Sequence, residues 1–169
     1  MDTDPRECIL MDATEKQRLI ASGEWRAAVI AEARSWLFTP YQHKGRIKKV
    51  GVDCGGLLYE CYQDIFGPFR AFPNDYPADW GMHKDGHELY LAFIMPYVIE
   101  VAHPIRGGFS LFKVGRNFSH AAIFTERGTY IHAWGRTQAG AVVESRPTFF
   151  RVGAKAREAK HFDVRLVCS

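Results

Sequence analysis

Apolar residues recur at three- and four-residue intervals in the first third of the chain, which is the spacing of one face of an α-helix. Trp25, Val29 and Trp36 follow this spacing and predict a helix from about Glu24 to Leu37. Thr39-Pro40 ends that helix, because the residue before a proline avoids the helical conformation.

A second apolar stripe predicts a helix that begins at Asp53 or Cys54 and ends near Phe66. Aspartate is favoured at the N-cap, where its carboxylate accepts a hydrogen bond from a backbone N–H of the first turn. Gly67-Pro68 marks the other end, since glycine takes the left-handed conformation that closes a helix and proline cannot continue it. A short third helix is predicted at about 86–93.

The second half of the chain alternates short apolar runs with glycine-containing turns, which is the pattern of an antiparallel sheet. Helices followed by strands predict an α+β fold. A chain of 169 residues suits one domain with a single core. We expect residues 23–169 to form that domain and the polar residues 1–22 to form a loosely attached N-terminal arm. The five predicted strands are Phe109–Val114, Ser119–Thr125, Thr129–Trp134, Ala141–Ser145 and Phe162–Val167.

Charge and composition exclude several classes of protein. The net charge is +3 and no basic run is interleaved with aromatic residues, so nucleic-acid binding is not predicted. No segment reaches the ~20 apolar residues of a membrane span. The N-terminus lacks the basic start and apolar core of a signal peptide, so we expect synthesis in the cytoplasm without export by that route. The four cysteines form no CxxC pair, which disfavours a structural zinc site.

Cys54 stands at the predicted start of the second helix and is followed by Gly55 and Gly56. A cysteine in a first helical turn faces unsatisfied backbone N–H groups and the positive end of the helix dipole, and both favour the reactive thiolate. Glycines are poor helix formers, so the pair indicates cleared space beside the sulfur and N–H groups that hold an oxyanion. The alternative is a small buried core residue, which is the common fate of cysteine.

A thiol nucleophile needs a base, and the base needs a group that orients it. His120 and His132 lie on consecutive predicted strands joined by Glu126-Arg127-Gly128, a three-residue loop whose glycine suits the left-handed position. Ala122 then opposes His132, so both imidazoles share one face as diagonal neighbours, and the small Ala122 leaves room for a helix end. A two-residue turn would put them on opposite faces. Either histidine alone is better explained as a core side chain, and only the pair in this register beside a cysteine at a helix start favours the catalytic interpretation.

These residues together resemble a known family. Gly51-Val52-Asp53-Cys54, then His120 at the start of a strand and Ile131-His132-Ala133, look like the NlpC-type cell-wall cysteine peptidases of bacteria. Thr39-Pro40-Tyr41 is similar to the TPY motif of that family, and Gly107 to Phe112 is similar to its GD strand. The resemblance covers roughly residues 26–150 and is closest to the phage-tail branch, which also occurs in gene transfer agents.

The resemblance implies a papain-like α+β fold with helices packed on a five-stranded antiparallel sheet. It implies hydrolysis of the peptide stems of peptidoglycan, typically after γ-D-glutamyl residues. It implies a tail-associated protein that acts in the periplasm or cell wall, with phage-like tail proteins as partners. No metal and no cofactor is expected. The implied roles are nucleophile for Cys54, base for His120, third polar residue for His132, and a place beside the substrate and oxyanion for Tyr41, Asp53 and Gly55.

Two departures and several alternatives accompany this interpretation. Gly55 stands where the family usually has serine, and Gly108 where it usually has aspartate. Tyr41 is equally explained as a tyrosine packed at a helix end. For the whole chain, the alternatives are a thiol amidase or acyltransferase on the same scaffold, a structural tail-tip protein without activity, and a zinc site built from Cys54, His120 and His132.

Overall fold

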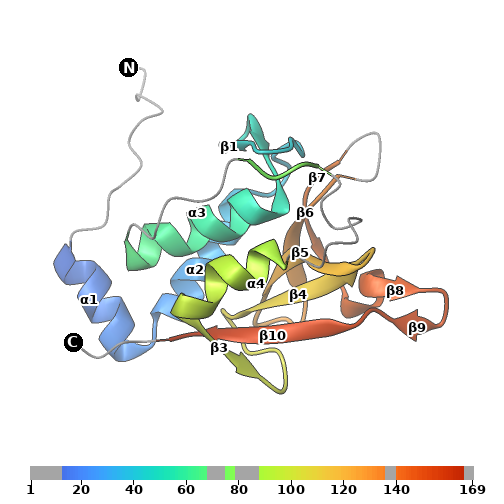
Figure 1. The fold of residues 1–169 in the computed structure, drawn as a ribbon. Coiled ribbons are helices and arrows are strands. Elements are labelled where there is room, and N and C mark those ends of the chain that lie inside the picture. Colours follow the sequence, from blue (N-terminus) through green and yellow to red (C-terminus); the bar gives the residue numbers. More distant parts are fainter. Residues whose placement is uncertain (1–12, 68–74, 79–87, 136–139, 166–169) are drawn as a thin grey trace.

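The structure, a computed structural model, describes residues 13–67, 75–78, 88–135 and 140–165. Figure 1 shows α2, α3 and α4 gathered on one side of the main sheet. No helix within the described ranges is long and apolar enough to cross a bilayer. The helices are α1 (Ala13–Ser22), α2 (Trp25–Ser35), α3 (Cys54–Phe66) and α4 (Leu89–Ile94), with the 3-10 helices η2 (Met95–Tyr97) and η3 (Pro147–Phe150).

The ends of α3 follow the local rules that predict them. Asp53 is the N-cap and accepts a hydrogen bond from the backbone N–H of Gly56 at 2.7 Å. Gly67 follows the helix with a φ of 85°, in the left-handed region that glycine tolerates. The predicted helix at 86–93 corresponds to α4, which runs from Leu89 to Ile94, and residues 86–87 lie outside the described residues.

Residues 13–22 form helix α1, where the sequence predicts a loosely attached arm. Leu19 of α1 is only 8% exposed and joins the same core as Trp25 and Val29 of α2. The sequence pattern did not predict this helix, because only a narrow apolar stripe of it is buried. Its other faces carry polar side chains such as Arg18, which forms an ion pair with Glu15. Residues 1–12 lie outside the described residues, and the domain boundary after residue 22 stays a prediction.

The main sheet has six antiparallel strands in the order β3-β10-β4-β5-β6-β7, one more than predicted. The additional strand is the edge strand β3, whose exposed Glu100 and Ile99 blur the apolar alternation. The last strand begins at Ala159, upstream of its predicted start at Phe162. The strands are β3 (Val98–Val101), β4 (Phe109–Val114), β5 (Asn117–Phe124), β6 (Tyr130–Trp134), β7 (Ala141–Ser145) and β10 (Ala159–Val164). Two small hairpins pair β1 (Arg46–Ile47) with β2 (Gly51–Val52), and β8 (Arg151–Val152) with β9 (Lys155–Ala156).

The two faces of the sheet are covered by different elements. Ala121 and Ile123 of β5 belong to the large core that includes Leu57 of α3. Ala122 faces the other way, into a small cluster closed by Phe150 of η3. The prediction that Ala122 leaves room for a helix end is therefore wrong, because an aromatic ring from η3 occupies that face.

Candidate active site

The sulfur of Cys54 lies at the first residue of α3 and contacts two other elements. Its thiol donates to the carbonyl oxygen of Ser119 at 3.7 Å, and the Tyr90 hydroxyl of α4 lies 3.0 Å from the sulfur. The backbone of Ala121 also acts on the sulfur and lowers its pKa. The thiol thus contacts the two residues that flank His120 in the chain. Cys54 as a residue is half-buried at the end of the helix, and its sulfur is turned toward the interior.

An irregularity in β5 makes this approach of the helix possible. Phe112 pairs with His120 and Lys113 pairs with Phe118, which leaves Ser119 as an extra residue on β5. A bulge of this kind leaves backbone groups without a ladder partner and bends the strand. On the other side, the described pairing of β5 with β6 consists of Ile123 with Ile131 and Phe124 with Tyr130. The main chain around Ser119 is therefore available to the thiol.

The two imidazoles lie side by side, as the predicted register requires. His120 Nε2 is 3.0 Å from His132 Nδ1, and the two rings are nearly perpendicular. The loop between the strands has the predicted form, because Gly128 has a φ of 70° and Thr125 donates its backbone N–H to the Thr129 carbonyl at 2.9 Å. The predicted loop length and the shared face of the histidines are confirmed.

Both ring nitrogens of His132 have hydrogen-bond partners. Burial lowers the pKa of His132 to about 4, so the ring is neutral at neutral pH. Its Nε2 lies 3.1 Å from the Ser145 hydroxyl and its Nδ1 faces His120 Nε2. If His132 donates from Nε2 to Ser145, its Nδ1 accepts from His120 Nε2–H. In that arrangement the lone pair of His120 is on Nδ1.

Burial dominates the electrostatics of the thiol. Burial, followed by the neighbouring charge of Asp53, raises the pKa of Cys54 to about 11. The Tyr90 hydroxyl and the backbone groups of Ala121 and Gly55 act in the opposite direction. The backbone N–H groups at the helix start lower the thiol pKa, which is the predicted direction, but burial and the N-cap carboxylate outweigh them. A base is needed to remove the thiol proton.

The carboxylate of Asp53, next to Cys54 in the chain, links several segments by hydrogen bonds. The residue is 2% exposed, and its carboxylate accepts hydrogen bonds from the Gly56 N–H, the Lys44 N–H at 2.8 Å and the Tyr76 hydroxyl at 2.6 Å. The imidazole of His43 lies 3.7 Å from the same carboxylate. Asp53 therefore joins the start of α3 to the preceding loop and to Tyr76, and its place beside a substrate stays a prediction.

Tyr41 lies near the thiol at the edge of the site. Burial raises the pKa of its hydroxyl, and the charges of Cys54 and Asp53 add to the shift. A side chain at Gly135 would collide with the Tyr41 ring, since a Cβ there would lie 2.5 Å from it. The missing side chain at Gly135 therefore leaves the space that the Tyr41 ring occupies. The role of Tyr41 toward an oxyanion stays a prediction.

The glycine pair after Cys54 has a different explanation from the one predicted for Gly56. A Cβ on Gly56 would lie 2.6 Å from the carbonyl oxygen of Gly45, so this glycine admits the loop before α3 and not a substrate. Gly55 is buried, and its backbone faces the sulfur. Gly108 also has a structural reason, because a Cβ there would lie 2.5 Å from the Phe162 carbonyl oxygen.

Sequence reasoning missed two residues that contact the predicted site. Ser145 pairs with Tyr130, two residues from His132 on β6, and extending the predicted register to β7 would have found it. Tyr90 lies in a six-residue helix without any motif, and no sequence signal marks it. Among the residues that the structure describes, no group of three or more His, Cys, Asp or Glu side chains is placed to hold a metal ion, so the zinc alternative finds no support in their arrangement.

The fold is the papain-like α+β fold of NlpC/p60 domains. The chain is similar to the crystal structure of the NlpC/p60 domain of the peptidoglycan hydrolase SagA, with a TM-score of 0.52. The two share 21% sequence identity over 83% of this chain and 98% of that domain. At this identity the likeness shows the fold, as predicted from the sequence. No family model and no curated protein matches the chain.

Proposed function

We propose that this protein is a cysteine hydrolase that cleaves the peptide stems of bacterial peptidoglycan. The observation that carries the proposal is the thiol of Cys54, which sits against the main chain on both sides of His120, while His120 hydrogen-bonds His132. The likeness to a domain of a peptidoglycan hydrolase supports the substrate class. The family resemblance of the motifs supports the three roles.

The proposed reaction is acyl transfer. His120 Nδ1 takes the thiol proton as the sulfur attacks the amide carbonyl carbon, and a sulfur–carbon bond forms. The tetrahedral oxyanion is held by backbone N–H groups at the start of α3, and Tyr41 is the candidate side chain beside them. His120 then returns the proton to the leaving amine as the carbon–nitrogen bond breaks. Water hydrolyses the thioester and regenerates the thiol.

The buried thiol explains why the histidine pair is needed. With a pKa of about 11 for Cys54, on the order of one thiol in ten thousand is ionised at pH 7. His120 must therefore remove the proton during attack. His132 orients His120 and accepts its Nε2–H, and the neutral state of His132 keeps that acceptor free of a proton.

Digestion of purified muropeptides tests the proposal, with products identified by mass. Cys54→Ala is expected to lose hydrolysis while keeping the wild-type circular dichroism spectrum. Cys61→Ala is the matched control, because Cys61 is a fully buried thiol on the same helix and faces the core. A Cys54→Ala variant as active as wild type would contradict the assignment.

The product masses also decide the finer proposals. Cleavage after a γ-D-glutamyl residue is proposed from the motifs alone, and fragments ending at that residue would support it. A purely amidase or acyltransferase activity would give different masses. Association with phage-like tail proteins and action in the periplasm or cell wall rest on the same resemblance. Co-purification of the chain with intact tail particles tests them.

A further inference from the structure

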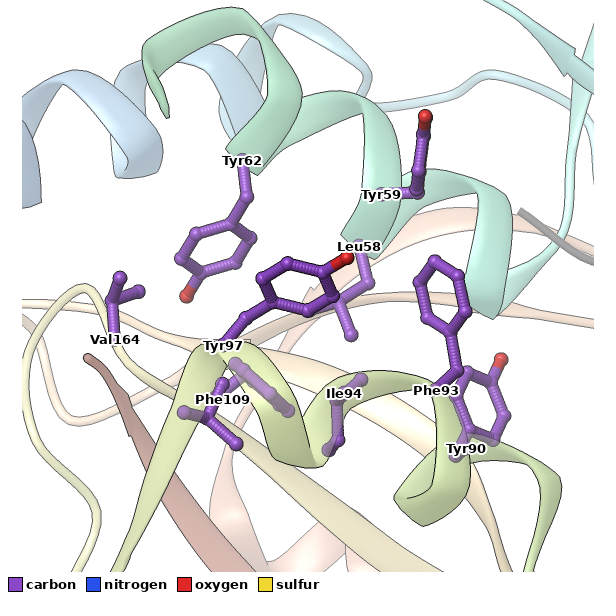
Figure 2. A pocket seen from close by; sticks show the side chains of 10 residues that line it. Leu58, Tyr59, Tyr62, Tyr90, Phe93, Ile94, Tyr97, Phe109 and Val164 are labelled. Atoms are coloured by element: carbon purple, nitrogen blue, oxygen red, sulfur yellow. The ribbon is translucent and has the colours of Figure 1, made fainter. Parts of the chain in front are cut away.

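A tyrosine that the motifs do not include contacts the reacting atom. Tyr90 lies on α4, and its hydroxyl oxygen is 3.0 Å from the Cys54 sulfur. The residue is 7% exposed, so it is fixed by packing and does not sample many positions at the surface. Its ring lines an apolar cavity between α3 and α4, together with Phe93, Ile94 and Leu58 (Figure 2). The ring packs against this cavity while the hydroxyl reaches the sulfur.

The direction of this hydrogen bond follows from the other contact of the thiol. A carbonyl oxygen only accepts hydrogen bonds, so the single thiol proton points to Ser119 when that bond is made. The Tyr90 hydroxyl is then the donor to the sulfur. When His120 removes the thiol proton, the Tyr90 donor remains in place, and a hydrogen bond to a charged acceptor is stronger than one to a neutral acceptor.

We propose that Tyr90 is a catalytic residue whose hydroxyl donates to the Cys54 sulfur and stabilises the thiolate that attacks the substrate. This inference rests on the proposed function for the identity of the nucleophile. The contact lowers the pKa of Cys54, against the effects of burial and of Asp53. Burial holds the pKa of the Tyr90 hydroxyl well above its ordinary value, so it stays protonated and keeps its donor.

The groups that face the sulfur define what a pH profile reports. Asp53 adjoins it at the helix start, Tyr90 contacts it from α4, and Tyr41 and Tyr76 interact with its charge from the loops on either side of α3. Asp53 and Tyr41 are unchanged by a substitution at Tyr90. A change in the pH dependence of the thiol in a Tyr90 variant therefore reports the lost donor.

Alkylation of the intact chain measures this donor without any substrate. The rate of iodoacetamide modification at Cys54, followed by peptide mass from pH 7 to pH 10, is compared between wild type and Tyr90→Phe. Phenylalanine keeps the ring in the cavity and removes only the hydroxyl. We expect the alkylation rate to fall about 3- to 10-fold at each pH, because a lost charge-assisted hydrogen bond raises the thiol pKa by ~1–2 units while the more basic thiolate is somewhat more nucleophilic.

Tyr62→Phe is the matched control, since Tyr62 lines the same cavity and its hydroxyl donates to the Gly107 carbonyl at 2.7 Å and not to the sulfur. Its alkylation rate is expected to equal that of wild type. Equal rates for wild type and Tyr90→Phe would overturn the role of Tyr90. A lower rate in Tyr90→Phe would support it, even if the wild type leaves muropeptides intact. Intact muropeptides after incubation with the wild type would refute the peptidoglycan proposal and leave the role of Tyr90 standing.

Discussion

Replacing Asp53 by alanine is expected to destabilise the protein strongly, because three separate donors meet on its carboxylate. The Gly56 N–H, the Lys44 N–H and the Tyr76 hydroxyl lie between 2.6 and 2.8 Å from its oxygens. The side chain is 4% exposed, so little water is available to replace its hydrogen bonds. The substitution removes the N-cap of α3 and also the attachment of the loop and of Tyr76 to that helix.

The magnitude follows from the three bonds. Loss of an N-cap costs ~0.5–2 kcal/mol of unfolding free energy, and each hydrogen bond to a charged group contributes ~1.5–3 kcal/mol. Lys44 is exposed and Tyr76 is half-buried, so both regain some bonding to water. We therefore expect a total loss of about 3–4 kcal/mol for Asp53→Ala. Asp53→Asn keeps one acceptor oxygen and is expected to lose about half as much.

Urea unfolding followed by circular dichroism measures these losses. Asp64→Ala is the control, because Asp64 lies in the last turns of the same helix, where a negative charge opposes the helix dipole. That variant is expected to stay within ~0.5 kcal/mol of wild type. An Asp53→Ala variant equally close to wild type would show that the carboxylate does not hold these segments together. Asp53→Asn should also speed alkylation of Cys54, since the Asp53 charge raises the pKa of that thiol.

Two further predictions concern the histidine pair. Ser145→Ala removes the hydrogen bond to His132 and should lower kcat about 5-fold, which corresponds to ~1 kcal/mol for one hydrogen bond. Ser110→Ala removes a similar serine–histidine bond to His161 and should leave kcat unchanged. Equal kcat values for the two variants would refute the role of Ser145. Burial depresses the pKa of His132 to about 4 in the folded state, so the unfolded chain binds the proton first. Stability should then fall by ~3 kcal/mol as pH drops from 6.5 to 4, a loss that urea titrations of a His132→Phe variant should not show.

The sequence predicted the structure best where residues close together in the chain decide the local geometry. The start of α3 follows from the capping preference of Asp53. The side-by-side histidines follow from a loop of three residues that ends in Gly128, because a sheet repeats every two residues and loop length fixes which side chains share a face. Helix α1 shows the limit of this approach, since its burial through Leu19 depends on a partner helix and not on its own pattern.

The sequence by itself determined the α+β order of the elements, the helix start at Cys54 and the pairing of His120 with His132, because each depends on residues only a few positions apart. The tertiary structure alone decided what surrounds the sulfur. Tyr90 and the bulged Ser119 reach it from distant elements. Burial by these elements also sets the thiol pKa near 11, a quantity that depends on packing density, which no local spacing encodes.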